Sequence, residues 1–117
     1  EEFENLVKPI QTDKDKKPMT GMTLVGKGIL DTFTGKHTDA KGWIENWIAD
    51  VEGSVWTVSQ DIKNKYSSAS FLANNVVIFN VKGNNYRLET QISYKISIVT
   101  VRWVGTHEEY DKRNKGR

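Results

Sequence analysis

Three side chains near the C-terminal end of the chain could carry acid–base or anion chemistry. Arg102 lies within the apolar run Val-Arg-Trp-Val at 101–104, and His107 and Tyr110 follow just after Gly105. A histidine can exchange a proton near neutral pH, whereas an arginine stays charged and can hold an anion. Tyr110 could orient a base or donate a proton. A helix-capping histidine and a packing tyrosine explain the same residues equally well, so both interpretations stay open.

A second arginine lies on the neighbouring predicted strand. In the segment Tyr-Arg-Leu-Glu-Thr-Gln-Ile, alternation places Arg87 on a polar face, and Arg102 lies on the same face of the next strand. Lys82 and Lys95 could border this surface. Two guanidinium groups with lysines nearby suit a phosphate, because each guanidinium can donate two parallel hydrogen bonds to an oxyanion. The alternative is that Arg87 only pairs with an acid such as Glu89.

The composition predicts one soluble domain. At 117 residues the chain is long enough for a single modest core, and it has no cysteine, which excludes disulfides and thiolate metal sites. Its two histidines lie far apart in sequence, so we expect no metal and no cofactor. No apolar run approaches the ~18 residues that a membrane span needs. Because the first residues also lack a secretory signal, we expect a cytoplasmic protein with no membrane partner.

Basic residues gather toward the C-terminus. The net charge is only +2, but from Lys82 onward eight basic residues face four acidic ones. This bias weakly favours a polyanionic partner, and a solvated tail is the alternative.

Three segments have the apolar spacing of helices. The first covers residues 24–37 after a short extended entry, with Gly35 as a stop, and the third is a shorter helix from about Ser59 to Tyr66. The second covers residues 41–52, follows an N-cap at 38–40 and ends at Gly53. Its apolar stripe consists of Trp43, Ile44, Trp47, Ile48 and Val51.

After residue 75 the apolar period changes to two, which indicates strands. One strand covers 76–83, a tight turn follows at Gly83-Asn84-Asn85, a second strand begins at Tyr86, and a third covers 96–105. The sequence therefore predicts an α+β fold, with N-terminal helices packed on a small antiparallel β meander.

Alternation also predicts which tryptophans are buried. It places Trp103 on the apolar face of the third strand, and Trp43 and Trp47 share the helical stripe that would cover that face. We expect these three in the core, and leave Trp56 open.

Several consecutive blocks resemble the HigB-type toxins of type II toxin–antitoxin systems, in the RelE-like mRNA interferase superfamily. The blocks are Ser-Ala-Ser-Phe-Leu at 68–72, the segment 76–88, and Val-Gly-Thr-His-Glu-Glu-Tyr-Asp at 104–111. The order of elements from Met22 to Asp111 also fits. The resemblance implies a RelE-like fold. One departure is the hairpin at 94–96, where many relatives have a second basic residue.

The resemblance implies an endoribonuclease that cleaves messenger RNA, free or on the ribosome, and is held inactive by a HigA-type antitoxin. Such toxins work without a metal, by attack of the RNA 2′-hydroxyl on the adjacent phosphate. Arg102 and Arg87 would contact that phosphate, and Gly105 would let the chain turn to place His107 and Tyr110 beside it. The further residues expected to contact RNA are Lys82, Asn84, Asn85 and Lys95. The alternative is a non-catalytic nucleic-acid-binding module that uses the basic tail.

The first 21 residues differ in character from the rest. Thr-Asp-Lys-Asp-Lys-Lys-Pro at 12–18 is dense in charge and has no apolar period, so residues 1–21 are predicted to be a flexible arm. Val-Lys-Pro-Ile-Gln-Thr at 7–12 is similar to the opening of antitoxins encoded beside these toxins. A natural extension, a remnant of cloning and a fused antitoxin fragment all stay open. Residues 22–117 would form the toxin-like domain.

Overall fold

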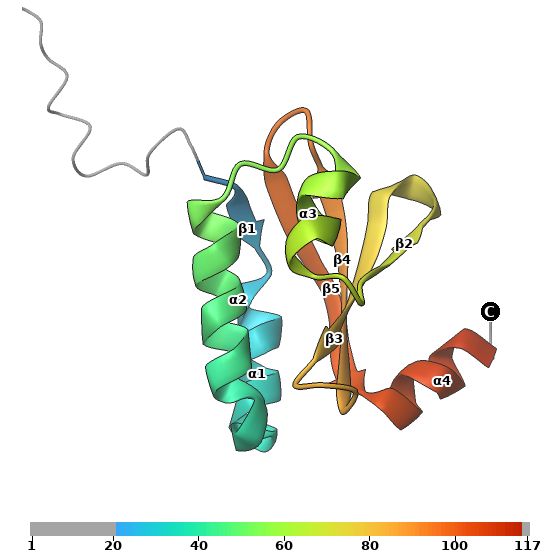
Figure 1. The fold of residues 1–117 in the computed structure, drawn as a ribbon. Helices are drawn as coiled ribbons and strands as arrows, with labels where there is room; N and C mark the ends of the chain where they lie inside the picture. Colours follow the sequence, from blue (N-terminus) through green and yellow to red (C-terminus); the bar gives the residue numbers. More distant parts are fainter. Residues whose placement is uncertain (1–20, 116–117) are drawn as a thin grey trace, which may run out of the picture.

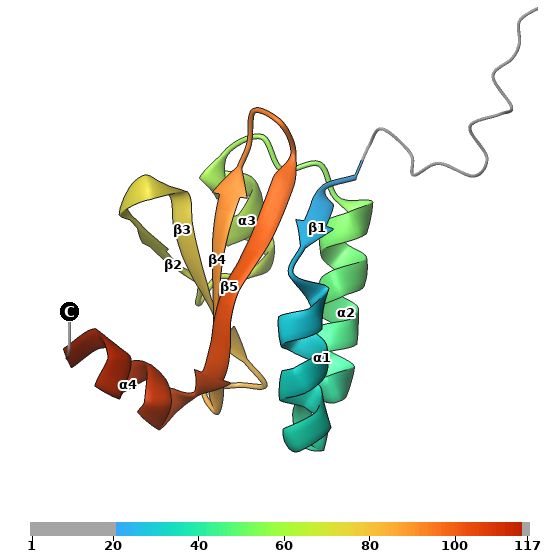
Figure 2. The same ribbon diagram turned by 180° about the vertical axis from the view of Figure 1, so that it is seen from behind.

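The computed structural model describes residues 21–115 (Figures 1 and 2). The arm predicted over residues 1–21 lies, apart from Gly21, outside the described residues. The described part is α+β, as predicted. Its elements are β1 (Thr23–Val25), α1 (Lys27–Lys36), the 3₁₀ turn η3 (Thr38–Ala40), α2 (Lys41–Gly53), α3 (Ser59–Lys65), β2 (Ser70–Leu72), the 3₁₀ turn η4 (Ala73–Asn75), β3 (Val76–Val81), β4 (Tyr86–Ser93), β5 (Ile98–Thr106) and α4 (His107–Lys115).

The sheet has the strand order β1-β5-β4-β3-β2. Its centre is the predicted antiparallel meander of β3, β4 and β5, in which Leu88 pairs with Val104. Two three-residue strands that the sequence did not predict extend it at the edges. β1 runs parallel to β5, with Leu24 beside Val99, and β2 runs antiparallel to β3. The sheet is therefore mixed rather than purely antiparallel.

Helices α1, α2 and α3 cover one face of the sheet, which we call the inner face (Figures 1 and 2). The apolar stripe of α2 is directed to it, as its spacing predicts: Ile44 and Trp47 are buried, and the Trp47 ring packs edge-on against Phe79 at 5.4 Å. Trp43 is half-buried against the same core, and Trp56, which the sequence left open, is buried. Burial of these large rings supplies much of the driving force for folding.

A β-bulge in β5 changes which residues lie on the opposite, outer face. Glu89 pairs with Trp103, but the next residue, Thr90, pairs with Val101, so Arg102 is an extra residue in β5. Beyond the bulge the alternation is reversed. The prediction that Trp103 lies on the inner face is therefore wrong: Trp103 shares the outer face with Glu89, while Val104 packs toward the core.

Helix α4 begins directly after β5, fixed by a capping box. The Thr106 N–H donates to Glu109 Oε1 at 2.8 Å, and the Glu109 N–H donates to Thr106 Oγ1 at 3.1 Å. The turn predicted at Gly105 does not form, because β5 continues through this residue to Thr106. A Cβ at Gly105 would lie 2.7 Å from both the Trp103 ring and Glu109 Oε1. The glycine therefore allows this ring and this carboxylate to lie against the strand.

Candidate functional site

The turn between β3 and β4 meets the start of α4 at one end of the sheet. The His107 N–H donates to the Asn85 carbonyl at 3.0 Å, and Arg87 is paired with Gly105 across the two strands. The structure thus brings together four of the predicted site residues. They are Asn84, Asn85, Arg87 and His107, and we call them the hairpin–α4 cluster.

Arg87 is held in place by the turn that precedes it. Its Nη1 donates to the carbonyl oxygens of Asn84 and Tyr86, each at 3.2 Å, and its Nη2 donates to Asn84 Oδ1 at 2.7 Å. A guanidinium has five N–H donors, so two remain for a ligand. Arg87 is therefore an oriented cation that can still bind one oxyanion. It does not pair with Glu89, the alternative that the sequence left open.

The carboxylate of Asp111 lies near the His107 ring. His107 Nδ1 lies 3.6 Å from Asp111 Oδ2, one helical turn along α4, and this nitrogen is shielded from solvent. The imidazole as a whole is 43% exposed. This arrangement turns the other nitrogen, Nε2, outward, where it can exchange a proton with a ligand. The separation of 3.6 Å is longer than a hydrogen bond, so Asp111 acts on the ring through its charge.

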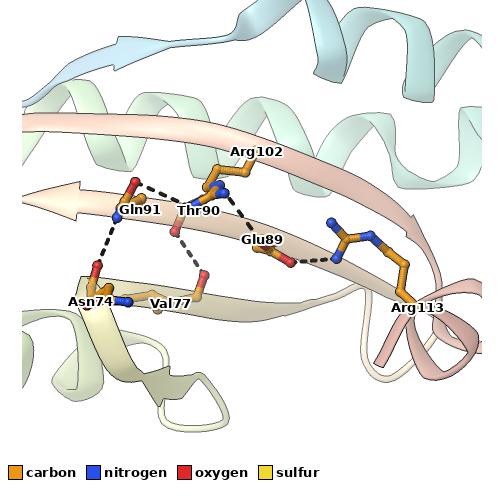
Figure 3. A network of polar contacts seen from close by, with 7 residues as sticks. All are labelled: Asn74, Val77, Glu89, Thr90, Gln91, Arg102 and Arg113. Atoms are coloured by element: carbon orange, nitrogen blue, oxygen red, sulfur yellow. Dashed lines mark hydrogen bonds and ion pairs between the residues drawn. The ribbon is translucent and has the colours of Figure 1, made fainter. Parts of the chain in front are cut away.

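Arg102 lies further along the outer face, in a network centred on a buried carboxylate (Figure 3). Glu89 is only 3% exposed; its Oε1 accepts from Arg113 Nη1 at 2.8 Å, and its Oε2 lies 3.9 Å from Arg102 Nε. Arg102 Nη1 also reaches Gln91 Oε1 at 3.4 Å. These contacts of Arg102 are long and the side chain is nearly half exposed, so most of its donors can bind a ligand.

Tyr110 and Trp103 connect the hairpin–α4 cluster to the network around Glu89. The Trp103 ring lies 6.0 Å from the Tyr110 ring, and the Arg113 guanidinium lies over it at 4.7 Å. Both distances are within the range of favourable aromatic and cation–π contacts. Tyr110 therefore packs on the outer face between His107 and the Glu89 network, which places it beside the predicted site.

The two lysines predicted to contact RNA lie at opposite ends of the sheet. Lys82 is in the β3–β4 turn with a φ of +52°, and its Nζ donates to the Asp39 carbonyl at 3.0 Å. Lys95 is exposed in the β4–β5 hairpin, roughly 20 Å from Arg87 along β4. Arg102 is itself roughly 15 Å from His107 along β5. The structure therefore does not bring Lys95 or Arg102 into the hairpin–α4 cluster.

Comparison with known protein families matches residues 40–113 to the HigB toxins, described as the RelE-like toxic component of a toxin–antitoxin system. The chain belongs to the HigB toxin family. The matched residues include the whole meander and α4 as far as Arg113, and hence every residue of the hairpin–α4 cluster. A comparison with curated proteins finds no match.

Membership of this family fixes the general role of the protein. A HigB toxin is the toxic component of a toxin–antitoxin pair, so an antitoxin is its partner. The four helices and five strands between residues 21 and 115 agree with the RelE-like fold that the resemblance implied.

Four outer-face residues of this toxin were not predicted from the sequence. They are Glu89, Trp103, Asp111 and Arg113. The i, i+4 spacing of His107 and Asp111 could have revealed that pair, because both lie in a segment that forms a helix. Glu89 and Arg113 are 24 residues apart, and only the folded chain shows that they meet.

The described residues hold neither a metal-binding cluster nor a membrane-spanning helix. Within residues 21–115, no three His, Cys, Asp or Glu side chains gather closely enough to hold a metal ion. In the same residues, every helix is too short or too polar to cross a membrane.

The pKa values of two tyrosines, Tyr66 and Tyr86, are raised above the ordinary range. Burial, together with a hydrogen bond to Asp50, raises the pKa of Tyr66. A hydrogen bond donated to Asp39 Oδ1 at 2.7 Å raises the pKa of Tyr86. Both hydroxyls therefore stay protonated at neutral pH and act as structural donors.

Proposed function

We propose that this HigB-family toxin is an endoribonuclease that cleaves messenger RNA without a metal ion. The observation that carries the proposal is the hairpin–α4 cluster. In it, an exposed imidazole with Asp111 nearby and an arginine with two unused donors lie on segments that are joined by backbone pairing. A proton-exchanging group beside an oriented cation is the minimum that phosphodiester cleavage by an internal hydroxyl needs.

The reaction begins when the RNA 2′-hydroxyl attacks the adjacent phosphorus. The O2′–P bond forms as a base removes the hydroxyl proton, and the P–O5′ bond breaks as an acid protonates the departing 5′ oxygen. The products are a 2′,3′-cyclic phosphate and a free 5′-hydroxyl. His107 would exchange one of these protons through Nε2, and the hydroxyl of Tyr110 is the candidate for the other.

The negative charge that builds up on the phosphate requires fixed cations. Arg87 would contact the scissile phosphate, and the side-chain amide of Asn84, whose oxygen orients Arg87, has N–H donors left for the RNA backbone. Arg102 lies further along the same face and would contact a different phosphate of the RNA backbone. An RNA strand that follows β4 would then approach Lys95, while Lys82 and Asn85 would border the strand at the other end.

The partner that we propose is a HigA-type antitoxin, and the proposed location is the cytoplasm, where messenger RNA is available. The substrate could be free messenger RNA or messenger RNA on the ribosome, and the same residues would act in both cases.

Expression of the full chain in a bacterium without an antitoxin tests this function. We expect rapid growth arrest and cleaved transcripts, mapped by sequencing of new 5′-hydroxyl ends. Normal growth with intact transcripts, in cells that contain the soluble protein, would contradict the proposal. Salt-sensitive RNA binding with no cleavage would instead favour a nucleic-acid-binding module.

A further inference from the structure

A cavity of about 530 Å³ lies between α1, β5 and α4, next to the proposed cleavage site. We call it the α1–α4 pocket. Helix α1 contributes one face to it, since the lining residues recur every three or four positions, and α4 contributes Glu109 and Arg113 from one side of the helix. The lining residues are Ile29, Thr32, Phe33, Lys36, His37, Trp103, Val104, Gly105, Glu109 and Arg113.

The floor of this pocket is an open strand edge. β1 pairs with β5 only from Ile98 to Thr100, so among residues 21–115 no strand lies beside that edge of β5 from Arg102 to Thr106. An unpaired strand edge presents backbone N–H and C=O groups. Trp103, Val104 and Gly105 line the pocket from this edge. The pocket floor can therefore both donate and accept hydrogen bonds.

The walls combine aromatic surface with positive charge. Trp103 and Phe33 line the pocket, and the Phe33 ring lies 4.8 Å from the His37 ring. Lys36 is an exposed cation at the rim, and Arg113 lies over the face of Trp103. Flat apolar surfaces suit a stacked base, and the cations suit its phosphate.

Glu109 adds a specific acceptor. Its Oε1 is occupied by the Thr106 N–H at 2.8 Å, and its other oxygen has no hydrogen bond to a residue in the 21–115 range. A carboxylate oxygen accepts from the exocyclic amino group of a base such as cytosine. Uracil carries a carbonyl at the same position, and two acceptors facing each other repel.

We propose that the α1–α4 pocket binds a single RNA nucleotide, with a preference for bases that carry an exocyclic amino group. The inference rests on the proposed ribonuclease function, because Gly105 lines the pocket and is paired with Arg87 across β5 and β4, so a base bound here would belong to a nucleotide near the scissile phosphate. The adjacent cleavage site and the two cations, Lys36 and Arg113, favour RNA over a peptide added to the strand edge.

Nuclear magnetic resonance of the full chain, titrated with cytidine and uridine 5′-monophosphates, tests this site without any cleavage. The indole N–H signal of Trp103 reports on the pocket and is assigned from its absence in Trp103→Phe. We expect CMP to shift this signal at lower concentration than UMP, and ribose 5-phosphate to shift it least. Lys36→Glu should weaken CMP binding about tenfold, the effect of one lost hydrogen bond to a charged group. The matched charge reversal Lys41→Glu, on α2 outside the pocket, should leave it unchanged.

Glu109→Gln is the decisive variant. Glutamine keeps a side-chain oxygen for the capping box, but it offers an N–H₂ donor in place of the second oxygen. The preference should therefore turn from CMP toward UMP. Equal shifts with ribose 5-phosphate, or an unchanged preference in Glu109→Gln, would overturn the proposal. So would shifts with a hexapeptide of alternating Leu and Glu but none with nucleotides, which would mark a protein-binding edge. Selective CMP binding by a chain that arrests no growth would instead refute the ribonuclease proposal and leave the nucleotide site.

Discussion

The two faces of the central strand β4 differ in what their side chains do. Leu88 and Ile92, on the inner face, are buried against the helices, whereas Arg87 and Gln91, on the outer face, are partly exposed. The outer face also buries a carboxylate, Glu89, which is stable there because two arginines surround it. The inner face therefore holds the fold together. The outer face keeps charged groups in fixed positions for a ligand.

The largest expected effect is on the inner face. Leu88→Ala removes a fully buried side chain and leaves a cavity in the core, so it should lower the free energy of unfolding by about 2–5 kcal/mol. Gln91→Ala, on the outer face of the same strand, should change it by less than about 1 kcal/mol. Urea unfolding of both variants checks this. Similar losses in the two variants would mean that the faces do not divide the labour in this way.

The next effect concerns the outer face and RNA. Arg87→Ala should slow single-turnover cleavage roughly 100- to 1,000-fold, as expected when one group that stabilises the transition state is removed. Lys95→Ala should leave the rate at saturating RNA unchanged, because Lys95 lies at the far end of the sheet. The Lys95→Ala change should only lower the slope of log affinity against log salt concentration by about one. A rate loss in Lys95→Ala as large as that in Arg87→Ala would show that the chemistry takes place elsewhere on the face.

A smaller effect should follow from breaking the Glu89 network. Glu89→Gln removes the buried charge that holds Arg113, and it should cost about 1–3 kcal/mol of stability because a hydrogen bond between charged groups is lost. Hydrogen exchange should show faster opening of α4. Glu45→Gln, which breaks the exposed pair of Glu45 with Lys41, should cost less than about 1 kcal/mol. Unchanged protection of α4 in Glu89→Gln would mean that Arg113 does not hold the helix.

The smallest effect is a pH dependence of stability that comes from Tyr66, which packs on the inner face. The pKa of Tyr66 is raised in the folded chain by burial and by its hydrogen bond to Asp50, so the unfolded chain releases this proton first. Its contribution to stability is therefore complete below about pH 10 and is lost as the pH rises above 10. Tyr66→Phe should be about 1 kcal/mol less stable at pH 7 and should lose less stability between pH 7 and pH 11. Urea unfolding at the two pH values checks the sign, and a steeper loss in the variant would contradict it.

Much of the inner half of the fold could be predicted from the sequence, because burial imposes a period. The stripe through Trp47 and the alternation through Leu88 each repeat often enough to fix an element and its buried face. The strands β1 and β2 have three residues each, too few for any period to appear. Their pairing depends on neighbours that are distant in the sequence.

The outer face was predicted less well, for a physical reason. A bulge inserts one residue without any change in composition. Strict alternation therefore assigns the residues after the bulge, Trp103 among them, to the wrong face. The pairing of Arg87 with Gly105, two residues before His107, follows from the register of β4 and β5. The contact of Glu89 with Arg113 depends on the direction in which α4 leaves the sheet, and local residue types do not encode that direction.

The most direct test of the ribonuclease site compares wild type with His107→Gln in single-turnover cleavage of a free RNA, in buffer containing EDTA. If His107 exchanges a proton in the reaction, its loss should lower the rate about 100- to 10,000-fold while RNA affinity, measured by fluorescence anisotropy, stays the same. Tyr110→Phe, measured alongside, shows whether that hydroxyl takes part. Cleavage by His107→Gln at the wild-type rate would show that the histidine is structural and would contradict the account.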